Sequence, residues 1–157
     1  MLELFVDADA CPVKDEAYRV AARHKMPVFV VTCLTMRDPA RAGVTMVRVE
    51  AGPDYADDWI AERVGAGDIC VTDDIPLAAR CVRAGALAVT ARGRLLHEGN
   101  IGEAVATRDL LDSLRGNGTL DDARGGGPPP FTKRDRSRFL EQMEQAVRTI
   151  QRNNAAE

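Results

Sequence analysis

Two pairs of aspartates directly follow two apolar runs of the sequence. Asp7 and Asp9 come after LELFV, and Asp73 and Asp74 come after ICVT. Carboxylates that are brought close together repel one another unless a proton or a cation lies between them. Hard oxygen ligands of this kind suit Mg²⁺ or Mn²⁺. If the two pairs meet in the fold, they predict a site for Mg²⁺ or Mn²⁺, which can activate water against a phosphodiester.

A third acidic group lies in GPDYADDWIAERV, and each acid also has a purely structural interpretation. We expect Asp54 to cap the helix that begins there, and Asp58 to lie on a solvated helix face. Asp57 follows Asp54 by about one turn and could point the same way, so both interpretations stay open for it. Asp74 precedes Ile75-Pro76, where a helix cap is also a good explanation.

Basic residues would be needed to hold a phosphate substrate. Lys14 follows the first acidic pair and Arg92 follows the last strand-like run, so either could bind phosphate or remain a solvated surface charge. Residues 133–138 form the densest basic tract, which is either a solvated helix face or an arm that contacts RNA. The formal net charge of -3 gives no strong basic field, which counts mildly against a nucleic-acid partner.

Short apolar runs alternate with segments of helical period, which predicts an α/β fold with a parallel sheet and helices on both faces. The predicted strands are Leu2–Val6, Val28–Cys33, Val44–Val49, Ile69–Thr72 and Ala86–Thr90. The predicted helices are 13–25, 54–64, 75–84, 101–115 and 133–151. Ligands of such sheets bind at the carboxyl ends of the strands. If the first and fourth strands are neighbours, both aspartate pairs face one cleft.

The length of 157 residues fits one compact domain. We predict an α/β domain over 1–115, a Gly/Pro-rich loop over 116–130 and an amphipathic helix over 131–157, packed on the domain or on a partner. Thr132 and Asp135 can cap that last helix. No apolar run is long enough for a membrane span, and the acidic N-terminal segment is unlike a signal peptide. A cytoplasmic location is expected.

Three stretches of the sequence together resemble a known family. FVDADACPVK, GDICVTDDIPLA and GGGPPPFTKRDRSRFLEQ are similar to the YaiI/YqxD family of uncharacterised bacterial proteins, in the same order and over nearly the whole chain. The resemblance implies a PIN-like domain with a three-layer Rossmann-like fold and about five strands in the order 3-2-1-4-5. It further implies a metal-dependent ribonuclease activity and a possible homodimer, since PIN-like domains often pair.

The same resemblance implies roles for individual acids. Asp7 matches the PIN acid at the end of the first strand, and Asp57 matches the acid in the helix before the fourth strand. Residues 72–77 are similar to the pattern T-x-D-x-x-L, which selects Asp74. Asp9 belongs to the DAD signature of the family and is an additional ligand. Asp7, Asp9, Asp57 and Asp74 are therefore the predicted metal ligands, with Asp7 and Asp74 as the catalytic residues.

The chain departs from the PIN pattern after the fifth strand. PIN nucleases often carry a fourth acid there, whereas this chain has Arg92-Gly93-Arg94 and no acid before Glu98. The leading prediction is a Mg²⁺- or Mn²⁺-dependent nuclease acting on RNA, with Lys14 or Arg92 steadying the phosphate. The departure favours an alternative, a non-catalytic PIN-like module that binds RNA or a protein through the same cleft.

A second enzymatic alternative is a phosphatase of the haloacid-dehalogenase type. The signature of that family begins with a strand ending in D-x-D, so Asp7 would be the nucleophile and Asp9 the acid/base. The family also needs a lysine between its second and fourth motifs, but the sequence has none between Lys25 and Lys133. This alternative therefore ranks below the nuclease.

Overall fold

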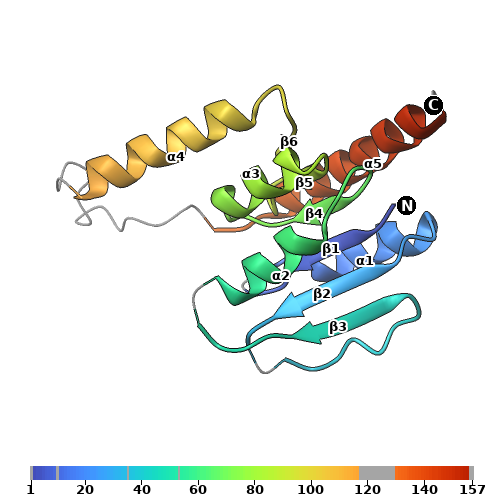
Figure 1. Ribbon diagram of the computed structural model, residues 1–157. Helices are drawn as coiled ribbons and strands as arrows, with labels where there is room; N and C mark the ends of the chain where they lie inside the picture. Colours follow the sequence, from blue (N-terminus) through green and yellow to red (C-terminus); the bar gives the residue numbers. More distant parts are fainter. Residues whose placement is uncertain (1, 10, 35, 53, 117–129, 156–157) are drawn as a thin grey trace.

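The structure is a computed structural model that describes residues 2–9, 11–34, 36–52, 54–116 and 130–155. Strands and helices alternate along most of the chain, as the sequence predicts (Figure 1). The strands are β1 (Leu4–Asp7), β2 (Val28–Thr32), β3 (Val44–Arg48), β4 (Ile69–Val71), β5 (Leu87–Val89) and β6 (Leu95–Leu96). The helices are α1 (Lys14–Arg23), α2 (Tyr55–Arg63), α3 (Ile75–Arg83), α4 (Ile101–Gly116) and α5 (Lys133–Ala155).

The six strands form one sheet in the order β3-β2-β1-β4-β5-β6. Strands β1 to β5 are parallel to one another. Their order in the sheet confirms the predicted order 3-2-1-4-5. β6 adds an antiparallel edge next to β5, through a turn in which the backbone N–H of Thr90 donates to Arg94 O at 3.0 Å. The sequence did not predict β6, because two residues are too few to show a strand period.

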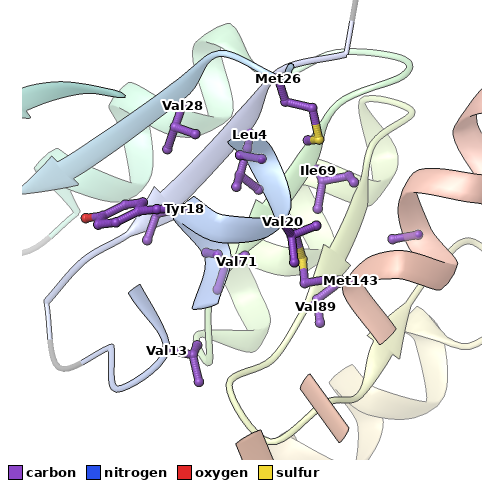
Figure 2. Packing of buried hydrophobic residues seen from close by; sticks show 14 of the residues in the cluster. Leu4, Val13, Tyr18, Val20, Met26, Val28, Ile69, Val71, Val89 and Met143 are labelled. Carbon is purple, nitrogen blue, oxygen red and sulfur yellow. The ribbon is translucent and has the colours of Figure 1, made fainter. Parts of the chain in front are cut away.

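Both faces of the sheet are covered by helices, which gives three layers (Figure 1). Leu4 and Val6 of β1 face α1 and α5, whereas Phe5 between them faces α2 and α3. Figure 2 shows the first of these two cores, where Val20 of α1 and Met143 of α5 pack among strand residues. Burial on both faces explains the nearly continuous apolar runs. The predicted three-layer Rossmann-like fold is confirmed.

The C-terminal helix α5 packs on the same core as α1. Its buried apolar side chains lie on one face: Phe139, Met143, Ala146, Val147 and Ile150. The helix begins with the predicted cap, since the N–H of Asp135 donates to Thr132 Oγ1 at 3.1 Å and the N–H of Thr132 donates to Asp135 Oδ2 at 3.0 Å. Of the predicted loop over 116–130, Gly116 ends α4, and 117–129 lie outside the described residues.

Helix α4 touches the rest of the protein mainly through its first turns. Ala104 packs against Ala78 and Val82 of α3, whereas Leu110 and Leu111 are exposed. In Figure 1, the second half of α4 extends beyond the sheet. Within the described residues, no helix is both long and apolar enough to cross a membrane.

Candidate functional site

A cavity of about 360 Å³ opens at the carboxyl ends of β1 and β4. Its lining includes six aspartates: Asp7, Asp9, Asp54, Asp57, Asp73 and Asp74. Among the described residues that line it, none is lysine, arginine or histidine. The carboxylates therefore repel one another with no basic side chain on the walls to compensate them.

The strand order brings the two predicted aspartate pairs together. β1 and β4 are parallel neighbours, with Val6 opposite Val71, so both strands end at the same edge of the sheet. Asp7 is the last residue of β1, and Asp74 lies three residues beyond the end of β4. The helix that follows β3 adds Asp57 to the same cavity. All four predicted metal ligands, Asp9 included, therefore line one cavity.

The hydroxyl of Thr72 is hydrogen-bonded to both catalytic candidates, Asp7 and Asp74. This hydroxyl donates to Asp7 Oδ2 at 2.8 Å and accepts from the backbone N–H of Asp74 at 3.0 Å. Burial raises the pKa of Asp7, the Thr72 hydrogen bond lowers it, and the charges of neighbouring aspartates raise it, so that the pKa lies above its usual value. The proton is thus held more tightly on Asp7 than on a solvated aspartate.

Asp74 is a helix cap, one of the two roles that the sequence left open for it, and it also lines the cavity. Its Oδ1 accepts from the N–H of Leu77 at 3.1 Å and caps α3, while the residue also lines the cavity. Asp57 lies opposite and shares a hydrogen bond with Asp74. Burial, followed by the charges of Asp74 and Asp7, raises the pKa of Asp57 to about 7. Asp57 is therefore partly protonated near neutral pH when no cation is bound.

Asp9 lines the cavity but is also bonded to the end of β2. Its carboxylate accepts from the hydroxyl of Thr32 and, at 3.1 Å each, from the N–H and the thiol of Cys33. Partial burial raises the pKa of Asp9, but these hydrogen bonds outweigh burial and the pKa lies below its usual value. Asp9 is therefore ionised and held in place, and it fastens the β1 loop to β2.

Two further acids line the cavity, Asp54 and Asp73. The sequence predicted a capping role for Asp54, and the pattern T-x-D-x-x-L selected Asp74 over Asp73. Asp73 Oδ1 accepts from the N–H of Ala91 at 2.8 Å, which ties the end of β4 to the end of β5. Asp54 precedes α2 as predicted, but its backbone is left-handed (φ 71°) and its side chain makes no capping hydrogen bond. Aspartate is one of the residues that adopt a left-handed backbone most readily, and this preference is the signal in the sequence for a turn at Asp54.

The two predicted phosphate-binding residues do not line the cavity. Lys14 Nζ donates to the carbonyl of Cys11 at 3.0 Å, and because Cys11 lines the cavity, Lys14 lies next to its rim. Arg92 forms an ion pair with Asp135 of α5 at 3.1 Å, and its guanidinium lies over the ring of Phe131. Arg92 thus joins the β5 loop to α5.

The donor chemistry of the cavity fits a hard divalent cation. Carboxylate oxygens are the ligands that Mg²⁺ and Mn²⁺ prefer. Burial and then repulsion among the aspartates raise the pKa of Asp7 and Asp57, and a cation would relieve the repulsion. In the described part of the chain, however, no three His, Cys, Asp or Glu side chains are grouped as a ready-made metal site. Ion binding therefore requires some of these carboxylates to turn from the positions seen here.

Comparison with known proteins identifies the family of the chain. A family model described as "Uncharacterized BCR, YaiI/YqxD family" matches residues 5–149. The chain belongs to the YaiI/YqxD family. This confirms the resemblance of the three sequence stretches, and the matched region includes every aspartate of the cavity and most of α5.

Curated relatives of the YaiI/YqxD chain share about half of its residues over nearly its whole length. A UPF0178 protein of Cereibacter sphaeroides (strain ATCC 17025) is 53% identical over 148 residues, covering 94% of this chain and 90% of the relative. A UPF0178 protein of Rhodopseudomonas palustris (strain BisB18) is 50% identical over 151 residues, covering 96% and 95%. No solved structure matches the chain with statistical significance.

Proposed function

We propose that the cavity binds Mg²⁺ or Mn²⁺ through Asp7, Asp57 and Asp74, with Asp9 as an additional ligand, and hydrolyses RNA phosphodiesters. One observation carries this proposal, namely the convergence of six aspartates on one cavity whose described lining has no basic side chain. Separate segments of the chain supply them, after β1, before and within α2, and after β4. Such an arrangement is electrostatically unfavourable unless a cation or protons compensate it.

The residues of the cavity would have different roles in this reaction. A bound Mg²⁺ or Mn²⁺ would supply water activation and neutralise charge on the phosphate. Thr72 holds Asp7 and the backbone of Asp74 in a fixed relation, and Asp57 would give up its proton to accept the cation. Lys14, which is bonded to the carbonyl of the lining residue Cys11, would contact a phosphate oxygen outside the ring of acids.

A non-catalytic binding module is the second candidate, and one observation favours it. The turn after β5, where PIN nucleases often carry a further acid, is bonded to α5 instead. Arg92 pairs with Asp135, and Gly93 lies directly against the backbone of Arg138. The turn therefore holds the last helix and supplies no acid to the cavity, which favours a module that binds without cleaving.

The test is cleavage of mixed single-stranded and structured RNA by the purified chain with Mn²⁺ or Mg²⁺. We expect cutting that EDTA stops, and that Asp7→Asn and Asp74→Asn each reduce at least a hundredfold, about the loss seen when one key transition-state contact is removed. Asp109→Asn is the matched control, because Asp109 is exposed on α4. RNA binding without cutting in the wild-type chain would overturn the nuclease and leave the binding module.

A further inference from the structure

Two exposed apolar residues are chain neighbours of residues that line the aspartate cavity. Tyr55 is 48% exposed and Leu34 is 58% exposed, and the other exposed large apolar side chains in the described residues, Leu110 and Leu111, lie on α4. Tyr55 lies between Asp54 and Ala56, which both line the cavity, and Leu34 follows Cys33, which lines it too. The rim of the cavity at the end of β2 and the start of α2 therefore lies next to Leu34 and Tyr55 in the chain.

The ring of Tyr55 is held in place at this rim. It lies against Gly52, where an added Cβ would come within 2.9 Å of Tyr55 Cε2, and Gly52 itself lines the cavity. The core does not need this ring, because the aromatic cluster behind it consists of Phe5, Phe29 and Trp59. Tyr55 therefore presents an ordered aromatic surface to solvent next to the acids.

The chemistry of the rim selects among possible ligands. An aromatic ring stacks on any nucleobase, and neither partner needs a charge, so the contact is not weakened by the surrounding carboxylates. Bases of a duplex are already stacked on one another, whereas those of a single strand are free to stack on a protein ring.

We infer that Tyr55 is a specificity residue whose ring is a stacking platform for a nucleobase of single-stranded RNA. The neighbouring phosphate then enters the aspartate cavity. The entry of the phosphate into the cavity and its hydrolysis rest on the proposed function, whereas stacking of the base on Tyr55 requires no cleavage of the RNA. It predicts that the chain prefers unpaired strands to duplexes.

The test compares short oligoadenylate with an abasic strand of the same length and charge, at constant salt. Binding is measured in the Asp74→Asn background, so that turnover does not consume the strand, and again in the wild-type chain without added metal. We expect the abasic strand to bind about 5- to 100-fold more weakly, the range for loss of one stacked base. Tyr55→Ala should abolish this difference, Tyr55→Phe should keep it, and Leu110→Ala on α4 is the matched control for loss of an exposed apolar side chain.

A spectroscopic readout separates stacking from a general effect on folding. Replacing one adenine by 2-aminopurine should give fluorescence that binding to the chain quenches, with quenching retained in Tyr55→Phe and lost in Tyr55→Ala. An unchanged base preference in Tyr55→Ala would overturn the platform even if the wild-type chain cuts RNA. A base preference that depends on Tyr55 in a chain that never cuts would support the platform and overturn only the nuclease.

Discussion

Asp57 shows how far a single carboxyl group depends on its neighbours. Burial, Asp74 and Asp7 raise its pKa to about 7 in the folded chain, well above the 3.8 of a solvated aspartate. Between these two values the folded state binds more protons than the unfolded state, so the free energy of unfolding falls as the pH rises through this window. Above pH 7 without a cation, Asp57 is an ionised group that opposes folding.

Asp57→Asn should therefore stabilise the metal-free chain at pH 8 and have little effect near pH 4. We expect a gain of about 1–2 kcal/mol in the free energy of unfolding at pH 8, after allowance for solvent screening of a half-exposed group. Urea unfolding in EDTA at both pH values measures it. Asp58→Asn is the neighbouring control, and it should give no gain because Asp58 forms an exposed ion pair with Arg80. An equal gain at both pH values would contradict the electrostatic explanation.

At the scale of elements, the turn after β5 and the start of α5 depend on one another. Gly93 has a left-handed backbone (φ 84°), and a Cβ added there would approach the carbonyl carbon of Arg138 to 2.6 Å. The ion pair of Arg92 with Asp135 holds the start of α5 to the turn after β5. Arg136 of the same helix end pairs with Glu16 of α1 and donates to the carbonyl of Pro12 in the loop before α1. The first turns of α5 thus fasten both loops that lead into the aspartate cavity.

Gly93→Ala should displace the start of α5. We expect a loss of about 2–4 kcal/mol, from the left-handed backbone together with overpacking against α5. Gly43→Ala is the control, because Gly43 has a similar backbone (φ 79°) but open space where the Cβ would go, and it should lose only about 1 kcal/mol. Chemical denaturation measures both variants, and equal losses would show that the contact with Arg138 contributes nothing.

The sequence predicted the elements better than it predicted their local contacts. Buried runs and helix periods gave the five parallel strands and five helices, since burial on both faces leaves a continuous apolar signal. Asp54 was predicted only as a helix cap, and its place in the cavity lining was not predicted because the direction of its side chain depends on turn geometry. The pairing of Arg92 with Asp135 joins residues far apart in the chain, a contact that no local pattern predicts.

On the scale of the whole molecule, the six aspartates of the cavity concentrate negative charge in a chain whose formal net charge is only -3. Most acids elsewhere are exposed or paired with basic side chains, as in the pairs of Arg23 with Glu144 and Arg136 with Glu16. Charge is thus compensated locally over much of the surface and left uncompensated at one edge of the sheet. Binding of a cation at this edge would stabilise the entire fold.

Mn²⁺ or Mg²⁺ should therefore raise the melting temperature at pH 8 and constant ionic strength. At a free ion concentration a hundred times the dissociation constant, binding to the folded state alone adds about 2.7 kcal/mol. We expect Asp7→Asn and Asp74→Asn to lose this response and Asp109→Asn to keep it. Differential scanning fluorimetry measures it, and a shift of the same size with Na⁺ alone would mean general screening rather than a site.

The covering of one sheet face by α5 also sets an order of events during synthesis. Leu4, Val6, Val28 and Val30 emerge from the ribosome early, but part of the layer that buries their side of the sheet comes from residues 139–150. Chains grow by roughly 5–20 residues per second, so this apolar face stays incompletely covered for several seconds. During that time the apolar face would be accessible to holding chaperones, until the synthesis and packing of α5 end its exposure.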